Sequence, residues 1–255
     1  MYLQITTKCN MKCDHCCYSC GKWGKHGEYE TIIDAIAFIR NWNDETISIG
    51  GGEPTLHPRF FDILKYCLED FDSVWMATNG SKTKTMFRLA NIIDQCDWES
   101  FDSEDYCICE TQEEKDNCHC EPEGLIYQED KLTVALSQDP FHNPIDQRIV
   151  DLWTRRSIVN NYNNHPHFEI RNTYTSTQGL SNSGRAKKNQ LAYSNHCPCS
   201  SLLIKPNGKI KLCGCSNSPI IGDVWNGIED KWEKIIDSDK FKETNCYQSL
   251  KKRRK

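Results

Sequence analysis

Strand-like and helix-like segments alternate along much of this chain, and the alternation limits the folds that it can adopt. Apolar and β-branched runs predict strands at residues 2–6, 46–50, 73–78, 132–137 and 167–172. Amphipathic or proline-initiated segments predict helices at residues 30–42, 58–70, 84–94 and near 145–162. Parallel strands need long crossover connections, which are usually helices, so this order predicts an α/β fold with a parallel sheet.

The 16 cysteines are the second constraint on this 255-residue chain. No apolar run approaches the ~18 residues of a membrane helix, and the first residues lack the apolar region of a signal peptide. We therefore expect a cytoplasmic protein with no membrane partner, in which grouped cysteines are more often metal ligands than disulfides. The net charge of −5 disfavours nucleic-acid binding over the whole surface.

The first cysteine group, KCNMKCDHCC at residues 8–17, has the spacing Cys9-x3-Cys13-x2-Cys16. A disulfide knot, a zinc site and an iron–sulfur cluster all use closely spaced cysteines. Three thiolates can ligate three irons of a [4Fe–4S] cluster and leave the fourth iron open to an outside ligand. Zinc normally takes four protein ligands in two separated pairs, so the spacing favours a cluster, with a zinc loop as the alternative.

A second motif, Gly50-Gly51-Gly52-Glu53-Pro54, follows the next predicted strand. This motif and the cysteine trio, with His15 before the last cysteine, resemble the radical S-adenosylmethionine (SAM) enzymes. In that family the glycine–glutamate motif binds the amino group of the SAM methionine. The residue types suit this role, because glycines let a backbone come close to a ligand and a carboxylate can accept from an ammonium.

The resemblance covers roughly residues 2–172 and implies a partial (β/α)6 TIM-like barrel, whose sites lie at the carboxyl ends of the strands. It implies that Cys9, Cys13 and Cys16 hold a [4Fe–4S] cluster and that the open iron takes the amino and carboxylate groups of SAM. Reduction of the cluster would then cleave SAM to methionine and a 5′-deoxyadenosyl radical, which abstracts a hydrogen atom. The implied partner is a reductase, an electron donor of the flavodoxin or ferredoxin type.

The ends of the later strands add polar residues that we expect in the same cavity. Asn79 follows the third strand, and Ser137 ends the fourth, where the family commonly places contacts to the ribose. Arg171 ends the fifth and is a candidate to meet an anionic group. The complete predicted cofactor-binding set is His15, Gly51, Gly52, Glu53, Pro54, Asn79, Ser137 and Arg171.

The carboxy-terminal cysteines flank a predicted hairpin, LLIKPNGKIKL, with Asn207-Gly208 as its turn. The segment resembles the start of the SPASM and twitch modules that hold auxiliary [4Fe–4S] clusters. Both of its pairs are C-x-C where those modules commonly have C-x2-C. The full seven-cysteine SPASM set is absent, so at most one auxiliary cluster fits, with zinc or plain thiols as alternatives. The candidate ligands are Cys197, Cys199, Cys213, Cys215 and Cys246.

We expect a core at residues 1–190 and a twitch-like module with a basic tail at 191–255. Within the core, the polar segment 173–190 reads as a linker or long loop, and 97–131 reads as an acidic insertion. The insertion either binds zinc or a further cluster through its cysteines, or is mobile and holds no metal. Its candidate ligands are Cys107, Cys109, Cys118 and Cys120.

Fold and cofactor do not name a substrate. A peptide or protein side chain is the expected class, because twitch and SPASM modules often accompany peptide modification. A nucleotide or small metabolite is the alternative, and a non-catalytic binding protein stapled by zinc is the alternative from a different class. Asp139 and His142, beyond the fourth strand, are the candidate catalytic residues for a substrate or proton role.

Overall fold

The computed structural model describes residues 1–42, 45–94, 131–162, 168–171, 183–191, 201–214 and 218–232. Residues 157–162 are described by their helical backbone only. Within these ranges, no helix is long and apolar enough to cross a membrane.

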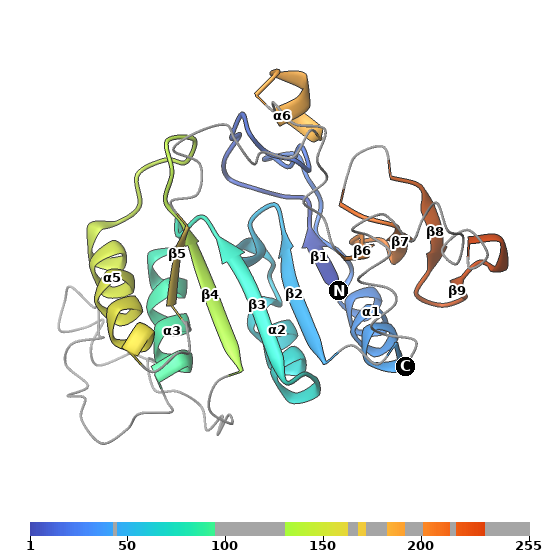
Figure 1. Ribbon diagram of the computed structural model, residues 1–255, viewed down its shortest axis with the longest axis horizontal. Coiled ribbons are helices and arrows are strands. Elements are labelled where there is room, and N and C mark those ends of the chain that lie inside the picture. The colour runs from blue at the N-terminus through green and yellow to red at the C-terminus, as the bar shows by residue number, and fades with distance from the viewer. Residues whose placement is uncertain are drawn as a thin grey trace.

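The described strands form one sheet of nine strands in the order β5-β4-β3-β2-β1-β6-β7-β8-β9 (Figure 1). Their bounds are β1 Tyr2–Thr6, β2 Thr46–Gly51, β3 Ser73–Thr78, β4 Leu132–Ser137, β5 Phe168–Arg171, β6 Leu203–Ile204, β7 Lys209–Lys211, β8 Ile220–Asp223 and β9 Gly227–Ile228. All neighbours from β5 to β6 pair in parallel, and the pairs from β6 to β9 are antiparallel. The six parallel strands curve without closing, as expected of a partial (β/α)6 barrel.

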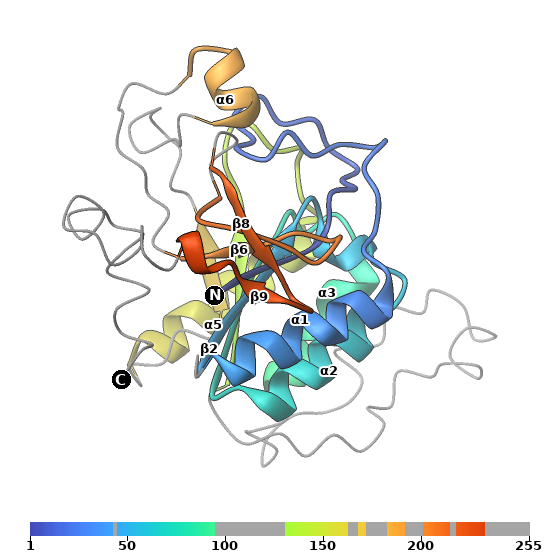
Figure 2. The ribbon, with the colours of Figure 1, turned by 90° about the vertical axis from the view of Figure 1, so that its right-hand side faces the viewer.

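Helices α1, α2 and α3 cover one face of the sheet, and α5 lies beside α3 near β5 (Figures 1 and 2). The bounds are α1 Tyr29–Asn41, the 3-10 helix η1 Pro54–Leu56, α2 Phe60–Asp70, α3 Thr83–Asp94, α5 Gln147–Tyr162 and α6 Gly184–Lys188. The predicted core strands and helices are therefore present, each within about two residues of its expected end.

The core forms where the apolar stripes of these helices meet the sheet. On α1, Ile32, Ile36 and Ile39 are buried, as the spacing of three and four residues predicts. They belong to the same apolar cluster as Leu3 and Ile5 of β1. Burial of this stripe fixes which face of the sheet is core and leaves the opposite face for a site.

The hairpin predicted around Asn207-Gly208 is present as β6 and β7, and Gly208 has the positive φ of 73° that such a turn needs. Its first strand pairs in parallel with β1, through Tyr2 with Leu203 and Leu3 with Ile204. The segment after residue 200 thus extends the sheet of the core.

The expectation of a linker or loop at 173–190 is wrong at its end, where Gly184–Lys188 forms helix α6. Ser183, in extended conformation and fully buried, precedes it, and Gly184 turns the chain with φ of 55°. The following Arg, Ala and two Lys residues are good helix formers. Residues 172–182 lie outside the described residues.

Candidate active site

The cysteine loop, which we define as residues 7–27, follows β1 and stands above the carboxyl ends of the parallel strands (Figure 1). Its two arms are held together by backbone hydrogen bonds, with the N–H of Cys9 donating to Gly21 at 3.0 Å and that of Thr7 donating to Lys25 at 2.8 Å. Between the arms, the loop encloses its own small apolar cluster. That cluster consists of Cys9, Met11 and Cys20, with Cys13, Cys16 and Tyr18 packed against it.

The predicted cysteine trio faces a cavity of about 420 Å³ at this end of the sheet. Cys9, Cys13 and Cys16 all carry free thiols. Burial raises the pKa of Cys9 to about 11, and a hydrogen bond with the Cys20 thiol lowers the pKa of Cys16. The predicted residues that line the cavity are Cys9, Cys13, His15, Cys16, Gly51, Gly52, Glu53, Asn79, Ser137, His142 and Arg171.

The glycine run packs against the end of β1 and the start of the cysteine loop. The N–H of Gly52 donates to the carbonyl of Thr6 at 2.8 Å. A Cβ added at Gly51 would lie 2.1 Å from the oxygen of Thr6, and one at Gly52 would lie 2.1 Å from that of Lys8. Glycine is therefore required for a close approach between two chain segments, which brings the motif to the cavity wall.

Glu53 is almost fully buried, with 1% of its surface exposed. Its carboxylate accepts from the hydroxyl of Thr55 at 2.6 Å, the hydroxyl of Thr78 at 2.8 Å and the N–H of Asn79 at 2.7 Å. Burial raises the pKa of Glu53, against the opposing effect of these hydrogen bonds. Glu53 thus joins the ends of β2 and β3 while lining the cavity. Pro54, the remaining residue of the motif, is buried at the start of η1.

Asn79 extends this connection to the cysteine loop. Its side-chain N–H₂ donates to Asn10 Oδ1 at 3.0 Å and lies 3.9 Å from the sulfur of Cys9. The predicted cofactor-binding residue therefore also helps to position the loop on β3.

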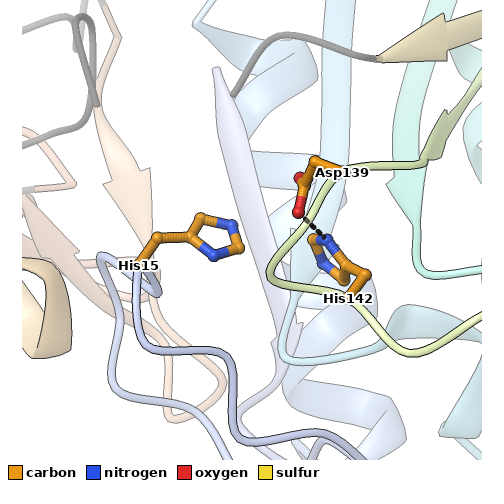
Figure 3. A group of neighbouring side chains, drawn as sticks. All are labelled: His15, Asp139 and His142. Atoms are coloured by element: carbon orange, nitrogen blue, oxygen red, sulfur yellow. Dashed lines mark hydrogen bonds and ion pairs between the residues drawn. The ribbon is translucent and has the colours of Figure 1, made fainter. Parts of the chain in front are cut away.

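His15, Asp139 and His142 meet at the other side of the loop (Figure 3). Nδ1 of His142 lies 2.8 Å from Oδ1 of Asp139, and one potential ligand atom from each of the three residues lies within 4.8 Å of the others. Burial alone would lower the pKa of His142, but hydrogen bonds to Asp139 and the Cys13 thiol outweigh it and raise the pKa to about 9. Asp139, whose side chain is 1% exposed, orients His142, which lines the cavity.

Sequence reasoning missed several residues that line the cavity. Tyr2 and Tyr18 stack with ring centroids 5.6 Å apart, and the Arg171 guanidinium lies 5.4 Å from the ring of Trp75. On β3, Val74, Met76 and Thr78 are buried while the alternate residues are partly exposed. Because strand side chains alternate between faces, that period of two identifies Trp75 as a residue of the face opposite the core.

Only part of the predicted auxiliary metal sites falls within the described residues. Cys213 is buried just after β7, and its N–H donates to the Ser218 hydroxyl at 2.9 Å. Its neighbour Gly214 lines the cavity. The other candidate ligands lie outside the described residues: Cys107, Cys109, Cys118, Cys120, Cys197, Cys199, Cys215 and Cys246.

Comparison with known protein families matches residues 3–98 to the Radical SAM superfamily. Residues 3–98 are therefore similar to the radical SAM domain. The match spans the cysteine trio, the glycine–glutamate motif and Asn79, which are the residues that the cavity brings together.

Curated relatives match this chain over part of their own length. The chain is 35% identical to mycofactocin maturase MftC of Mycobacterium ulcerans (strain Agy99) over 79 residues, which are 30% of this chain and 21% of the relative. It is 30% identical to an S-adenosylmethionine-dependent nucleotide dehydratase of a Thermoplasmatales archaeon (strain ISO4-H5) over 95 residues, which are 36% of this chain and 34% of the relative. The chain thus matches about a fifth to a third of the length of these relatives.

A solved structure extends the likeness to the whole fold. The structure of BtrN in complex with AdoMet and 2-DOIA matches with a TM-score of 0.58 and 14% identity, covering 99% of this chain and 87% of that chain. The prediction of a partial TIM-like barrel is confirmed by this likeness and by the six parallel strands.

The superfamily implies a [4Fe–4S] cluster and SAM, and the donor set of this cavity fits them. Three free thiols from one loop face the same cavity, which is the soft donor set that iron–sulfur clusters use. Among the described residues the three thiols do not converge within 4.8 Å, as ligands of a single ion would. A four-iron cluster is larger than one ion and is held by thiolates that stand farther apart.

Proposed function

We propose that this protein reductively cleaves SAM at a [4Fe–4S] cluster held by Cys9, Cys13 and Cys16, and that it abstracts a hydrogen atom from a substrate. When bound, the cluster supplies the electron that converts SAM to methionine and a 5′-deoxyadenosyl radical. The single observation that carries the proposal is the meeting of the cysteine trio, the glycine–glutamate motif and the strand-end residues at one cavity. A non-catalytic binding protein with structural zinc sites does not require such a cavity.

The residues of the chain have distinct parts in this proposal. The cysteines would hold the cluster, and the backbone of Gly51 and Gly52 would offer polar groups to the methionine part of SAM. Glu53 would keep that backbone in place through its bonds to β3. Ser137 and Asn79 line the same cavity and are suited to the ribose hydroxyls.

Next to the loop, His142 and Asp139 are the proposed catalytic pair. A histidine fixed by a carboxylate can hold or move a proton at its other nitrogen. His142 lines the cavity, and Asp139 would act by orienting it. Arg171 and Trp75 supply a cationic and an aromatic surface to the same cavity.

For the substrate we favour a peptide or protein side chain, since the cysteine spacing after residue 196 resembles modules that accompany peptide modification. The match to a protein named mycofactocin maturase is compatible with this class, and the match to one named nucleotide dehydratase keeps a nucleotide as the alternative. We further propose one auxiliary cluster with Cys213 among its ligands, a flavodoxin- or ferredoxin-type electron donor and a cytoplasmic location.

Iron analysis of two variants tests the cofactor part of this proposal. Wild type, the Cys9→Ala/Cys13→Ala/Cys16→Ala variant and Cys67→Ala would be reconstituted anaerobically and analysed for iron, sulfide and zinc. Cys67 is a buried cysteine of α2 in the core, so its replacement is the matched control. We expect the triple variant to lose four irons relative to both other proteins, and any remaining iron to report the auxiliary site. Zinc in place of iron in wild type would contradict the proposal.

A further inference from the structure

Helix α6 lies directly over the cysteine loop, and the side-chain hydrogen bonds between the two segments join residues that are at least 165 apart in sequence (Figures 1 and 2). The motifs at the cavity explain how the loop is attached to β2 and β3. They leave open what holds the outer part of the loop, between Cys13 and Cys20, in shape.

Arg185, the second residue of α6, makes three hydrogen bonds to this outer part. Its backbone N–H donates to the carbonyl of Cys16 at 2.9 Å. Its guanidinium donates from Nε to the carbonyl of Cys13 at 2.8 Å and from Nη1 to that of Cys20 at 2.6 Å. One side chain therefore spans the loop and fixes the carbonyls of two cysteines at once.

The residues on either side of Arg185 complete the contact. The hydroxyl of Ser183 donates to the carbonyl of Cys17 at 3.1 Å, and the side-chain amide of Asn189 donates to that of Asp14 at 3.1 Å. A Cβ at Gly184 would lie 2.3 Å from the Cys17 oxygen, so glycine lets the segment sit this close. The segment thus satisfies loop carbonyls of Cys13, Asp14, Cys16, Cys17 and Cys20.

The loop needs such support for two physical reasons. It contains no regular secondary structure between Cys9 and Cys20, so its partly buried carbonyls must find donors elsewhere. Within it, Ser19 has a φ of 56°, a left-handed conformation that a side chain disfavours. A loop with these features would not keep three thiols in place by local preference alone.

We propose that residues 183–189 are a clamp that holds the cysteine loop in its cluster-binding shape, with Arg185 as the positioning residue. The proposal rests on the proposed function for the identity of the bound group. It assigns two separable effects to Arg185. The guanidinium fixes the loop through two carbonyls, and it adds a positive charge to the cavity that the three cysteines also line.

The two effects predict different results for two substitutions. R185K keeps the positive charge but lacks the planar guanidinium that donates to two carbonyls. R185M removes the charge and the two donors together. Loss of the guanidinium loosens the loop, so R185K and R185M should both release iron about tenfold faster to a chelator than wild type. Loss of the charge disfavours the more negative, reduced cluster, so only R185M should shift the midpoint potential to a more negative value.

The test uses the full-length protein and K188A as the matched control. Lys188 is exposed on the same helix, and its side chain makes no hydrogen bond or ion pair with the described residues of the loop. Iron release to a chelator and the midpoint potential would be measured on anaerobically reconstituted protein. Tryptic cleavage after Lys12, an exposed loop residue, would be followed in metal-free protein.

Each outcome decides the inference. Faster cleavage after Lys12 in both metal-free Arg185 variants than in K188A, together with faster iron release, supports the clamp. Equal cleavage and iron release in wild type, R185K, R185M and K188A overturns it while leaving the proposed function intact. Wild type that binds no iron contradicts the proposed function, and the cleavage assay then still tests whether the clamp orders the loop.

Discussion

The carboxylate of Glu53, at the end of β2, accepts a 2.7 Å hydrogen bond from the backbone N–H of Asn79, at the end of β3. Asn79 in turn donates to Asn10 of the cysteine loop at 3.0 Å. These two bonds connect the glycine–glutamate motif with the cysteine motif through a third strand. The geometry of the cavity therefore depends on a carboxylate that is satisfied by the protein itself.

Replacing Glu53 by alanine should destabilise the fold. The substitution leaves the buried hydroxyl of Thr78 and the N–H of Asn79 without an acceptor, so we expect the free energy of unfolding to fall by about 2–4 kcal/mol. Urea unfolding of the metal-free protein measures the change. Glu69→Ala, at an exposed position of α2, is the control and should change it by less than about 0.5 kcal/mol. Equal midpoints for both variants would show that the Glu53 bonds do not stabilise the fold.

Gly52→Ala should disturb the attachment of the cysteine loop. The new Cβ would lie 2.1 Å from the oxygen of Lys8, and overpacking of this kind costs about 1–3 kcal/mol. We expect lower iron loading after reconstitution. At Gly21 an added Cβ would meet nothing within 4 Å, so Gly21→Ala, in the same loop, should load as wild type does. Full loading of Gly52→Ala would mean that β2 and the loop can separate without loss of the site.

Asp139→Asn should separate cluster binding from turnover. The change weakens the 2.8 Å contact that orients His142 but leaves all three cysteines unchanged. We expect iron content close to wild type and a fall of about 10- to 100-fold in the rate of 5′-deoxyadenosine formation. Asp146→Asn, at a more exposed aspartate before α5, should leave the rate unchanged. An unchanged rate in Asp139→Asn would remove the pair from the proposed mechanism.

The stability of the fold should fall as the solution becomes more acidic, in part because of His57. Burial lowers the pKa of His57, whose Nε2 lies 3.0 Å from the carbonyl of Gly27 and whose Nδ1 accepts the N–H of Arg59 at 3.1 Å. An acceptor role at Nδ1 requires the neutral ring, while the unfolded chain takes up a proton below about pH 6.5. Stability is therefore fully present above that pH and is lost as the pH falls through the lowered folded pKa.

Comparison of wild type with His57→Gln checks this assignment. Glutamine can still donate to the Gly27 carbonyl but does not titrate. The unfolding free energy of wild type should decrease more steeply than that of His57→Gln between pH 7 and pH 5. Parallel curves for the two proteins would exclude His57 as a source of the pH dependence.

The sequence predicted those elements whose pattern of apolar residues fits only one kind of secondary structure. Helix α1 buries the expected Ile32, Ile36 and Ile39, and the turn at Gly208 has the expected conformation. The cysteine trio and the glycine–glutamate motif could be placed together because both follow parallel strands, whose carboxyl ends meet at one edge. These predictions depend on local pattern and on sheet topology alone.

The remaining features depend on contacts between distant segments, which periodicity does not encode. The segment around Arg185 is rich in Ser, Asn and Gly, so it was expected to be a loop, and its helix is stabilised by carbonyls of the cysteine loop. The role of Glu53 could not be assigned either, because its partners Thr78 and Asn79 come from another strand. In both cases the hydrogen-bond partners come from a segment that is distant in the sequence.

The most direct test of the central claim is formation of 5′-deoxyadenosine by anaerobically reconstituted protein supplied with SAM and dithionite. Wild type and Cys67→Ala should both form it, and the Cys9→Ala/Cys13→Ala/Cys16→Ala variant should form none. Wild-type protein that carries a full complement of iron and sulfide yet leaves SAM intact under these conditions would contradict the account.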